Sequence, residues 1–314
     1  MTRSATSLAY FGPAGTFTEQ ALLTQPDYAV AERQPLPTIT DVLEAVSSGR
    51  VDLGFVPLEN GIEGTVPITL DGLVFDFDLL IQREVVLDIH LALMANAGTR
   101  LTDVTSVLSF PHALAQCRKF LAAKIPAAES VAAPSTAEAA RALSEHPDGS
   151  MAVIAPRSAA DAYGLVVLAE EIEDHPENQT RFVAVATSGI PSATDHDHTS
   201  IVCFQRADRP GSLHSIIGQF SGRDINLTKL ESRPTKRGLG DYCFVIDLEG
   251  HIADEVVADC LRDLHANQGR VKFLGSYPAA GHHGPGKRLA AEQTWRQADD
   301  WVRSLRSQIR EDGE

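Results

Sequence analysis

Basic residues are scarce in this chain, which has 27 Lys and Arg against 42 Asp and Glu and therefore a net charge of −15. Nucleic acids and anionic membrane surfaces attract clustered positive charge, so this shortage argues against both as partners. The sequence also lacks the roughly 18 consecutive apolar residues of a membrane span. Residues 1–7 contain no apolar stretch typical of a signal peptide. These absences predict a soluble, cytoplasmic globular protein.

Cysteine is equally sparse, and its spacing fits neither a disulfide framework nor a metal site. The four cysteines lie far apart in apolar stretches without a Cys-x-x-Cys pair: Cys117, Cys203, Cys243 and Cys260. We expect them to be core residues in a reducing compartment. The histidines at 196, 198, 282 and 283 lie in connectors without further ligands at fixed spacing. No metal and no cofactor is therefore predicted.

The length of 314 residues indicates two domains of roughly 100–200 residues each. From residue 8 to 187, short apolar runs alternate with helical patterns, which is typical of an α/β sheet with crossover helices. Strands are predicted over 8–12, 53–56, 104–108 and 151–155. Thr16-Phe17-Thr18-Glu19 and Ser135-Thr136-Ala137-Glu138 match the capping box, so helices are expected to begin there.

A faint internal repeat relates residues 40–57 to residues 136–156. Each segment runs through a helix, a glycine-containing turn, a short apolar strand and a proline. Two similar α/β lobes facing each other across a cleft would produce such a repeat. We expect the chain to enter the second lobe near Val85 and to return to the first over residues 181–187.

A polar connector rich in Gly, Pro and Ser occupies residues 188–198 and is predicted to link the first domain (1–187) to a second domain (199–278). The second domain has the βαββαβ order of the ferredoxin-like split unit. The predicted fold class is therefore α/β, with a two-lobed first domain and a ferredoxin-like second domain. Residues 279–314 form a tail with an apolar stripe at helical spacing, expected to pack on a neighbour: Trp295, Ala298, Val302, Leu305 and Ile309.

Polar residues follow several predicted strands of the first domain. The turn at 12–18 joins a strand to a capped helix, so backbone donors near Gly15 and Thr16 could hold a carboxylate, although a plain strand-to-helix turn would look the same. Open α/β sheets bind ligands beyond the carboxyl ends of their strands. Two pairs occupy that position and are expected to face the cleft: Glu59 with Asn60, and Ser109 with Gln116.

Further candidates lie near the end of the first domain and in the second. Thr180 and Arg181 by themselves suggest only a solvated strand start. Residues 211–213 open a helix whose N–H groups could take a small carboxylate, and residues 226–234 place polar side chains at the end of a half-buried strand. His112 and Cys117 are five residues apart on a helix, a spacing that does not bring them together as a nucleophile and its base.

Together these segments resemble the prephenate dehydratase family over residues 8–278. The motifs that carry the resemblance are Gly12-Pro13-x-Gly15-Thr16-Phe17-Thr18, Pro57-Leu58-Glu59-Asn60, Ser109-x-Pro111, Ala113-Leu114-Ala115-Gln116-Cys117, Asn178-x-Thr180-Arg181-Phe182 and Glu231-Ser232-Arg233-Pro234. Gly61 departs from the pattern, because the family usually has Ser there. The resemblance implies a catalytic region folded like a type II periplasmic-binding protein, followed by an ACT regulatory domain that binds L-phenylalanine.

The implied reaction converts prephenate to phenylpyruvate with loss of CO2 and water, driven by ring aromatisation and without metal or cofactor. The resemblance assigns catalysis to Thr180, Arg181, Glu59, Asn60, Ser109 and Gln116. It assigns substrate binding to Gly15, Thr16 and Phe182. It assigns effector binding, between the subunits of a homodimer or homotetramer, to Gly211, Ser212, Leu213, Glu231, Ser232 and Arg233.

Two alternatives stay open at this point. An arogenate dehydratase would act on the aminated substrate, and a non-catalytic sensor could use the same two modules to bind a small molecule. Because prephenate is a dianion, the cleft of this acidic protein is expected to be positive or rich in hydrogen-bond donors. Binding of phenylalanine is expected to act on the cleft through the linker at 188–198.

Overall fold

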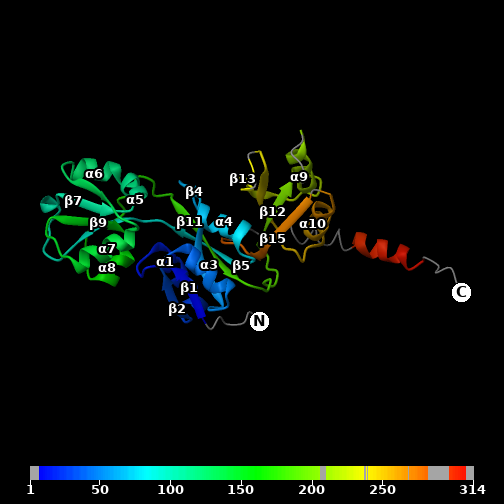
Figure 1. Cartoon of the computed structure of the whole chain (residues 1–314), viewed down its shortest axis with the longest axis horizontal. Coiled ribbons are helices and arrows are strands. Elements are labelled where there is room, and N and C mark those ends of the chain that lie inside the picture. Colours follow the sequence, from blue (N-terminus) through cyan, green and yellow to red (C-terminus); the bar gives the residue numbers. More distant parts are fainter. Residues whose placement is uncertain are drawn as a thin grey trace. The chain divides into compact units, whose positions relative to one another are not determined.

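The computed structural model describes residues 7–205, 210–236, 238, 240–267, 269–281 and 297–308. The chain divides into two compact units (Figure 1), one comprising residues 1–79 and 84–187, the other residues 80–83 and 188–314. The first unit therefore differs from the predicted first domain in residues 80–83, which group with the second unit. Among the described helices, none has the length and apolar character to cross a membrane.

The first lobe is built on a mixed six-stranded sheet in the order β2-β1-β3-β11-β5, with β4 paired to β3. Its strands are β1 (Ser7–Phe11), β2 (Glu32–Leu36), β3 (Leu53–Asn60), β4 (Gly64–Thr65), β5 (Leu80–Asp88) and β11 (Gln179–Ala186). Its helices are α1 (Phe17–Leu23), α2 (Pro26–Ala29), α3 (Ile39–Ser47), α4 (Pro67–Asp71) and the π-helix η1 (Gly72–Asp76). Residues of α1 and α2 pack on the sheet face that carries Phe55, and residues of α3 pack over Gly54 on the other.

The second lobe contains a five-stranded sheet in the order β10-β6-β9-β7-β8. Its elements are β6 (Ala92–Ala95), the 3-10 helix η2 (Leu101–Asp103), β7 (Ser106–Ser109), α5 (Pro111–Gln116), α6 (Arg118–Lys124), β8 (Glu129–Ala132), α7 (Thr136–Glu145), β9 (Met151–Ala155), α8 (Arg157–Tyr163) and β10 (Val166–Ala169). Helices α5 and α6 cover one face of this sheet and α7 and α8 cover the other (Figure 1).

The chain crosses from the first lobe to the second later than the sequence predicts. Strand β5 continues to Asp88 beside β11 in the first sheet, and Val85 belongs to the first lobe's core. The predicted entry into the second lobe near Val85 is therefore wrong, because pairing with β11 keeps the chain in the first lobe until β6. The predicted return of the chain over residues 181–187 is confirmed by β11.

The predicted helix starts are confirmed by side-chain caps. The Thr16 hydroxyl accepts a hydrogen bond from the Glu19 N–H at 3.2 Å, and the Ser135 hydroxyl accepts one from the Glu138 N–H at 3.0 Å. Each cap satisfies a backbone donor that the first helical turn leaves without an intrahelical partner. These two helices therefore begin where the local sequence places them.

The second unit contains a four-stranded sheet in the order β13-β14-β12-β15 with two helices on one face. Its elements are β12 (Asp197–Gln205), α9 (Ser212–Ser221), β13 (Leu227–Pro234), β14 (Tyr242–Glu249), α10 (Glu255–Asn267) and β15 (Gly269–Pro278). This order confirms the predicted βαββαβ unit. Asp197, expected in the linker, is instead the buried first residue of β12, where its carboxylate accepts hydrogen bonds from the Thr194 N–H and hydroxyl.

The cysteines lie in the cores, and part of the C-terminal tail is helical. All four cysteines are buried and none forms a disulfide, which confirms them as core residues. Residues 297–306 are helical, and Trp301 on this helix is 63% exposed. The stripe residues Trp295 and Ile309, and the pair His282-His283, lie outside the described residues.

Candidate active site

Two neighbouring strands carry most of the predicted catalytic residues. In the antiparallel pairing of β3 and β11, Thr180 is opposite Asn60 and Arg181 is opposite Glu59. The register then slips by one residue at Leu58, a bulge of the kind that re-aims side chains beside active sites. Residues that are far apart in the sequence are thereby brought together at the end of β3.

The side-chain amide of Asn60 has a defined orientation. Its Oδ1 accepts hydrogen bonds from the N–H groups of Ile62 and Glu63, both at 3.0 Å, so its Nδ2 faces the other way. Nδ2 donates to the Thr180 hydroxyl at 2.8 Å. Because the Thr180 oxygen accepts this bond, the hydroxyl proton of Thr180 can be donated to another group.

Asn178 continues this network, although the sequence assigns it no role. It is 2% exposed, its Oδ1 accepts from Asn60 Nδ2 at 3.0 Å, and its Nδ2 donates to Gln116 Oε1 at 3.3 Å. Gln116 comes from α5 of the second lobe, so the network joins the two lobes. The one available sequence signal was the place of Asn178 at the head of the Asn-x-Thr-Arg-Phe motif.

Arg181 lies between two carboxylates on the strands that flank β11. Its Nη1 is 3.6 Å from Glu59 Oε2 and its Nε is 2.7 Å from Glu84 Oε2. The side chain of Glu84 on β5 is 5% exposed, whereas that of Glu59 is 34% exposed. Sequence reasoning assigned no role to Glu84, because it is one of several polar residues in this strand, beside Gln82 and Arg83.

Two of the predicted site residues, Ser109 and Phe182, are buried away from the polar network. Ser109 is fully buried and its hydroxyl donates to the Ile154 carbonyl at 2.6 Å, because a buried hydroxyl must find a partner within the sheet. The expectation that its side chain faces the cleft is therefore wrong. Phe182 is 1% exposed and stacks on Phe55 in the core of the first lobe, with ring centroids 5.8 Å apart.

The turn that carries Gly15 and Thr16 lies against α8 of the second lobe. The Gly15 N–H donates to the Glu19 carboxylate at 2.6 Å, and the Tyr163 hydroxyl donates to the Ala14 carbonyl at 2.8 Å. Gly15 has φ +79°, and a Cβ there would approach Ala159 Cα to 3.0 Å. Close packing thus accounts for this glycine, and its role in substrate binding stays a prediction.

Other reactive groups are arranged as structural residues. His112 Nδ1 lies 3.1 Å from Glu63 Oε2. Cys117 is buried, and burial, with a smaller effect of Glu173 and Asp174, raises the pKa of its thiol well above the usual range. The low-pKa thiolate that nucleophilic cysteines require is therefore disfavoured. The part of the chain that the structure describes holds no group of three potential metal ligands.

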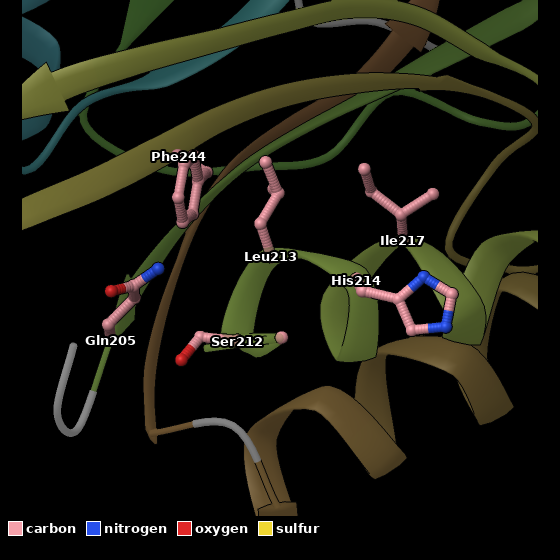
Figure 2. A pocket seen from close by; sticks show the side chains of 7 residues that line it. Gln205, Ser212, Leu213, His214, Ile217 and Phe244 are labelled. Carbon is pink, nitrogen blue, oxygen red and sulfur yellow. The ribbon is translucent and has the colours of Figure 1, made fainter. Parts of the chain in front are cut away.

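The second unit contains a pocket of about 480 Å³ beside the start of α9 (Figure 2). It is lined by Gln205, Gly211, Ser212, Leu213, His214, Ile217 and Phe244. Volumes of about 300–1,000 Å³ are typical of small-molecule sites. Gly211 has φ +88° as the N-cap residue of α9, a conformation that favours glycine.

The second predicted effector segment lies on β13, at the edge of the sheet. Ser232 pairs with Phe244, a pocket residue, so these two side chains share the face covered by the helices. Glu231 and Arg233 alternate onto the opposite face, where they form an ion pair at 3.6 Å. Only Ser232 of this segment therefore shares a sheet face with the pocket, and the effector site stays a prediction.

Fold and site together define a two-lobed α/β protein with a polar network joining its lobes, followed by a ferredoxin-like domain with a pocket beside the start of α9. The prephenate dehydratase family matches residues 8–189 and the ACT domain family matches residues 199–266. The chain belongs to the prephenate dehydratase family. The predicted order, a prephenate dehydratase followed by an ACT domain, is thereby confirmed.

Two similar proteins carry the name of this family, and a third carries a different one. A prephenate dehydratase of Mycolicibacterium vanbaalenii is 40% identical, with 95% of this chain and 98% of the relative covered. The solved structure of a prephenate dehydratase of Arthrobacter aurescens in complex with L-Phe has a TM-score of 0.87 at 38% identity, covering 96% of this chain and 99% of that one. A structure described as a novel type of quorum quenching acylase has a TM-score of 0.79 at 26% identity, covering 87% and 98%.

Proposed function

We propose that this protein converts prephenate to phenylpyruvate, CO2 and water, as expected of a member of its family. The observation that carries the proposal is the hydrogen bond from Asn60 Nδ2 to the Thr180 hydroxyl, which directs the Thr180 proton away from Asn60. The sensor alternative gives no reason for an oriented hydroxyl beside an arginine. The structure described as an acylase is less similar in sequence, at 26% identity, than the prephenate dehydratases. Because one fold can host many activities, its likeness in fold does not support an acylase activity here.

The reaction needs a proton at the leaving hydroxyl. As the ring C–O bond breaks with its electron pair, Thr180 donates its proton and water leaves. The C–C bond to the ring carboxylate breaks, CO2 departs, and that electron pair completes the aromatic ring. Solvent then returns a proton to Thr180. Because threonine is a very weak acid, stabilisation of the developing negative charge by Asn60 matters as much as the transfer itself.

Substrate binding is assigned to groups around this network. Arg181 is suited to bind a substrate carboxylate, because its planar guanidinium matches carboxylate geometry. Gln116 is held by Asn178 and would orient the substrate from the second lobe, and Gly15 and Thr16 are proposed to bind it through the turn. Ser109 and Phe182 are proposed to support the site from within β7 and β11, since both are buried in those strands.

The test is turnover of purified protein on prephenate and on arogenate, followed as phenylpyruvate and phenylalanine, with and without chelator. We expect prephenate turnover that chelator does not change. Turnover of arogenate alone would make the protein an arogenate dehydratase. Binding of prephenate without turnover of either compound would favour the sensor.

L-Phenylalanine is proposed as the allosteric effector, bound at the pocket of the ACT domain (199–278) between subunits of a homodimer or homotetramer. Support comes from the relative solved with L-Phe and from β13, an edge strand of the kind that a second subunit can cover. Coupling between effector and catalytic site is expected to be about 1–3 kcal/mol, or about 5- to 150-fold inhibition. A cytoplasmic location is also proposed, and it is supported by four buried cysteines that form no disulfide.

Two substitutions on α9 test the effector site. Ser212 lines the pocket, so Ser212→Phe should fill it and abolish binding of L-phenylalanine in calorimetric titration. Ser215 is exposed on the same helix and does not line the pocket, so Ser215→Phe is the matched control. Equal affinity in both variants would refute this site. Light scattering at each effector concentration would distinguish monomer, dimer and tetramer.

A further inference from the structure

Glu84 is a buried charge that the sequence motifs leave unexplained. It lies on β5, which neighbours β11 on the side away from β3. Its side chain is 5% exposed, and its Oε2 lies 2.7 Å from Arg181 Nε. Removing a carboxylate from water is unfavourable unless a well-placed partner compensates for it, so this position needs its arginine.

We propose that Glu84 is a positioning residue that sets the orientation of the Arg181 guanidinium toward the substrate carboxylate. The inference rests on the proposed function. A guanidinium is rigid and planar, so a carboxylate that forms an ion pair with it, 2.7 Å from Nε, restricts the directions in which its N–H donors point. Glu59, on the other flanking strand, is more exposed and farther from Arg181, which makes Glu84 the interior anchor.

A second effect of Glu84 has the opposite sign. Its negative charge lowers the positive potential at Arg181, so its removal by electrostatics alone would strengthen binding of a dianionic substrate. If Glu84 orients Arg181, its removal weakens binding, because small errors in the position of a binding group cost large factors in rate. The sign of the change in KM therefore separates positioning from a purely electrostatic influence.

The kinetic test compares Glu84→Gln, which keeps the shape and removes the charge, with Glu84→Asp, which keeps the charge on a shorter side chain. We expect Glu84→Gln to raise the KM for prephenate at least 10-fold with kcat within about 5-fold, and Glu84→Asp to recover part of the loss. Glu173→Gln is the matched control, because Glu173 is 2% exposed and pairs with His90 rather than Arg181. It should leave both constants within about twofold. A KM for Glu84→Gln that is unchanged or lowered would overturn the proposal.

A second measurement reads the arginine directly and needs no turnover. The guanidinium signals of Arg181 in NMR, assigned by their disappearance in Arg181→Lys, should show slow rotation about the Nε–Cζ bond in the parent and rotation at least 10-fold faster in Glu84→Gln. Equal rotation in the two proteins would overturn the proposal even if prephenate were not the substrate. If the parent shows no turnover but the rotation changes as expected, the proposed function is contradicted and the positioning of Arg181 by Glu84 still holds.

Discussion

Replacing Thr180 by valine removes a single hydroxyl from the centre of the polar network. Valine is isosteric and β-branched, so it suits the strand position of Thr180. Asn60 Nδ2 loses one acceptor but keeps the Asn178 side-chain oxygen at 3.0 Å and the Gln179 carbonyl at 3.3 Å. The loss of one hydrogen bond should lower the free energy of unfolding by about 0.5–1.5 kcal/mol.

The effect on rate should be much larger. Loss of a proton donor commonly lowers kcat by about 10²–10⁴, which corresponds to roughly 2.7–5.4 kcal/mol of activation free energy. The matching change in melting temperature is at most about 6 °C for a unit of this size. Initial rates of phenylpyruvate formation, measured beside thermal melts of the same samples, separate the two quantities.

Thr180→Ser is the control, because it restores the hydroxyl without the methyl group and should regain most of the parental kcat. A folded Thr180→Val protein with kcat within twofold of the parent would remove Thr180 from the mechanism. Equal impairment of the serine and valine variants would instead assign the loss to packing.

Three further outcomes are expected. Asn178→Ala should lower kcat/KM by about 10- to 100-fold, because it releases Gln116 and one contact of Asn60; steady-state kinetics with unchanged constants would exclude the network from catalysis. Phe182→Leu should lower the free energy of unfolding by about 1–3 kcal/mol in urea titrations while leaving KM near the parental value, since its ring lies in the core. A large rise in KM would instead indicate that Phe182 contacts the substrate. The hydrogen bond to Glu173 raises the pKa of His90 above its ordinary value, so its stabilising contribution is complete below about pH 6.5 and is lost as pH rises through the folded-state pKa. The difference in melting temperature between parent and His90→Gln should therefore be larger at pH 5.5 than at pH 8.5, and a difference that grows with pH would contradict this sign.

Several features of this protein could be predicted because they depend on residues close together in the chain. The caps at Thr16 and Ser135 join each hydroxyl to a backbone N–H three positions on, and both helices begin there. The βαββαβ order follows from short alternating and helical patterns, and β9 was predicted with its observed bounds. The combination of motifs was sufficient for the family, which the comparisons confirm.

The directions of the functional side chains depend on strand register and on contacts between distant parts of the chain. Asn60 and Asn178 are 118 positions apart, and they meet only because β3 pairs with β11 through the bulge at Leu58. Arg181 lies between Glu59 and Glu84 because β11 is flanked by β3 on one side and by β5 on the other. Ser109 follows a strand as predicted, yet it turns into the sheet because the Ile154 carbonyl is there to accept its proton. Local patterns specify the strands, whereas the neighbours that a side chain meets are decided when the sheet assembles.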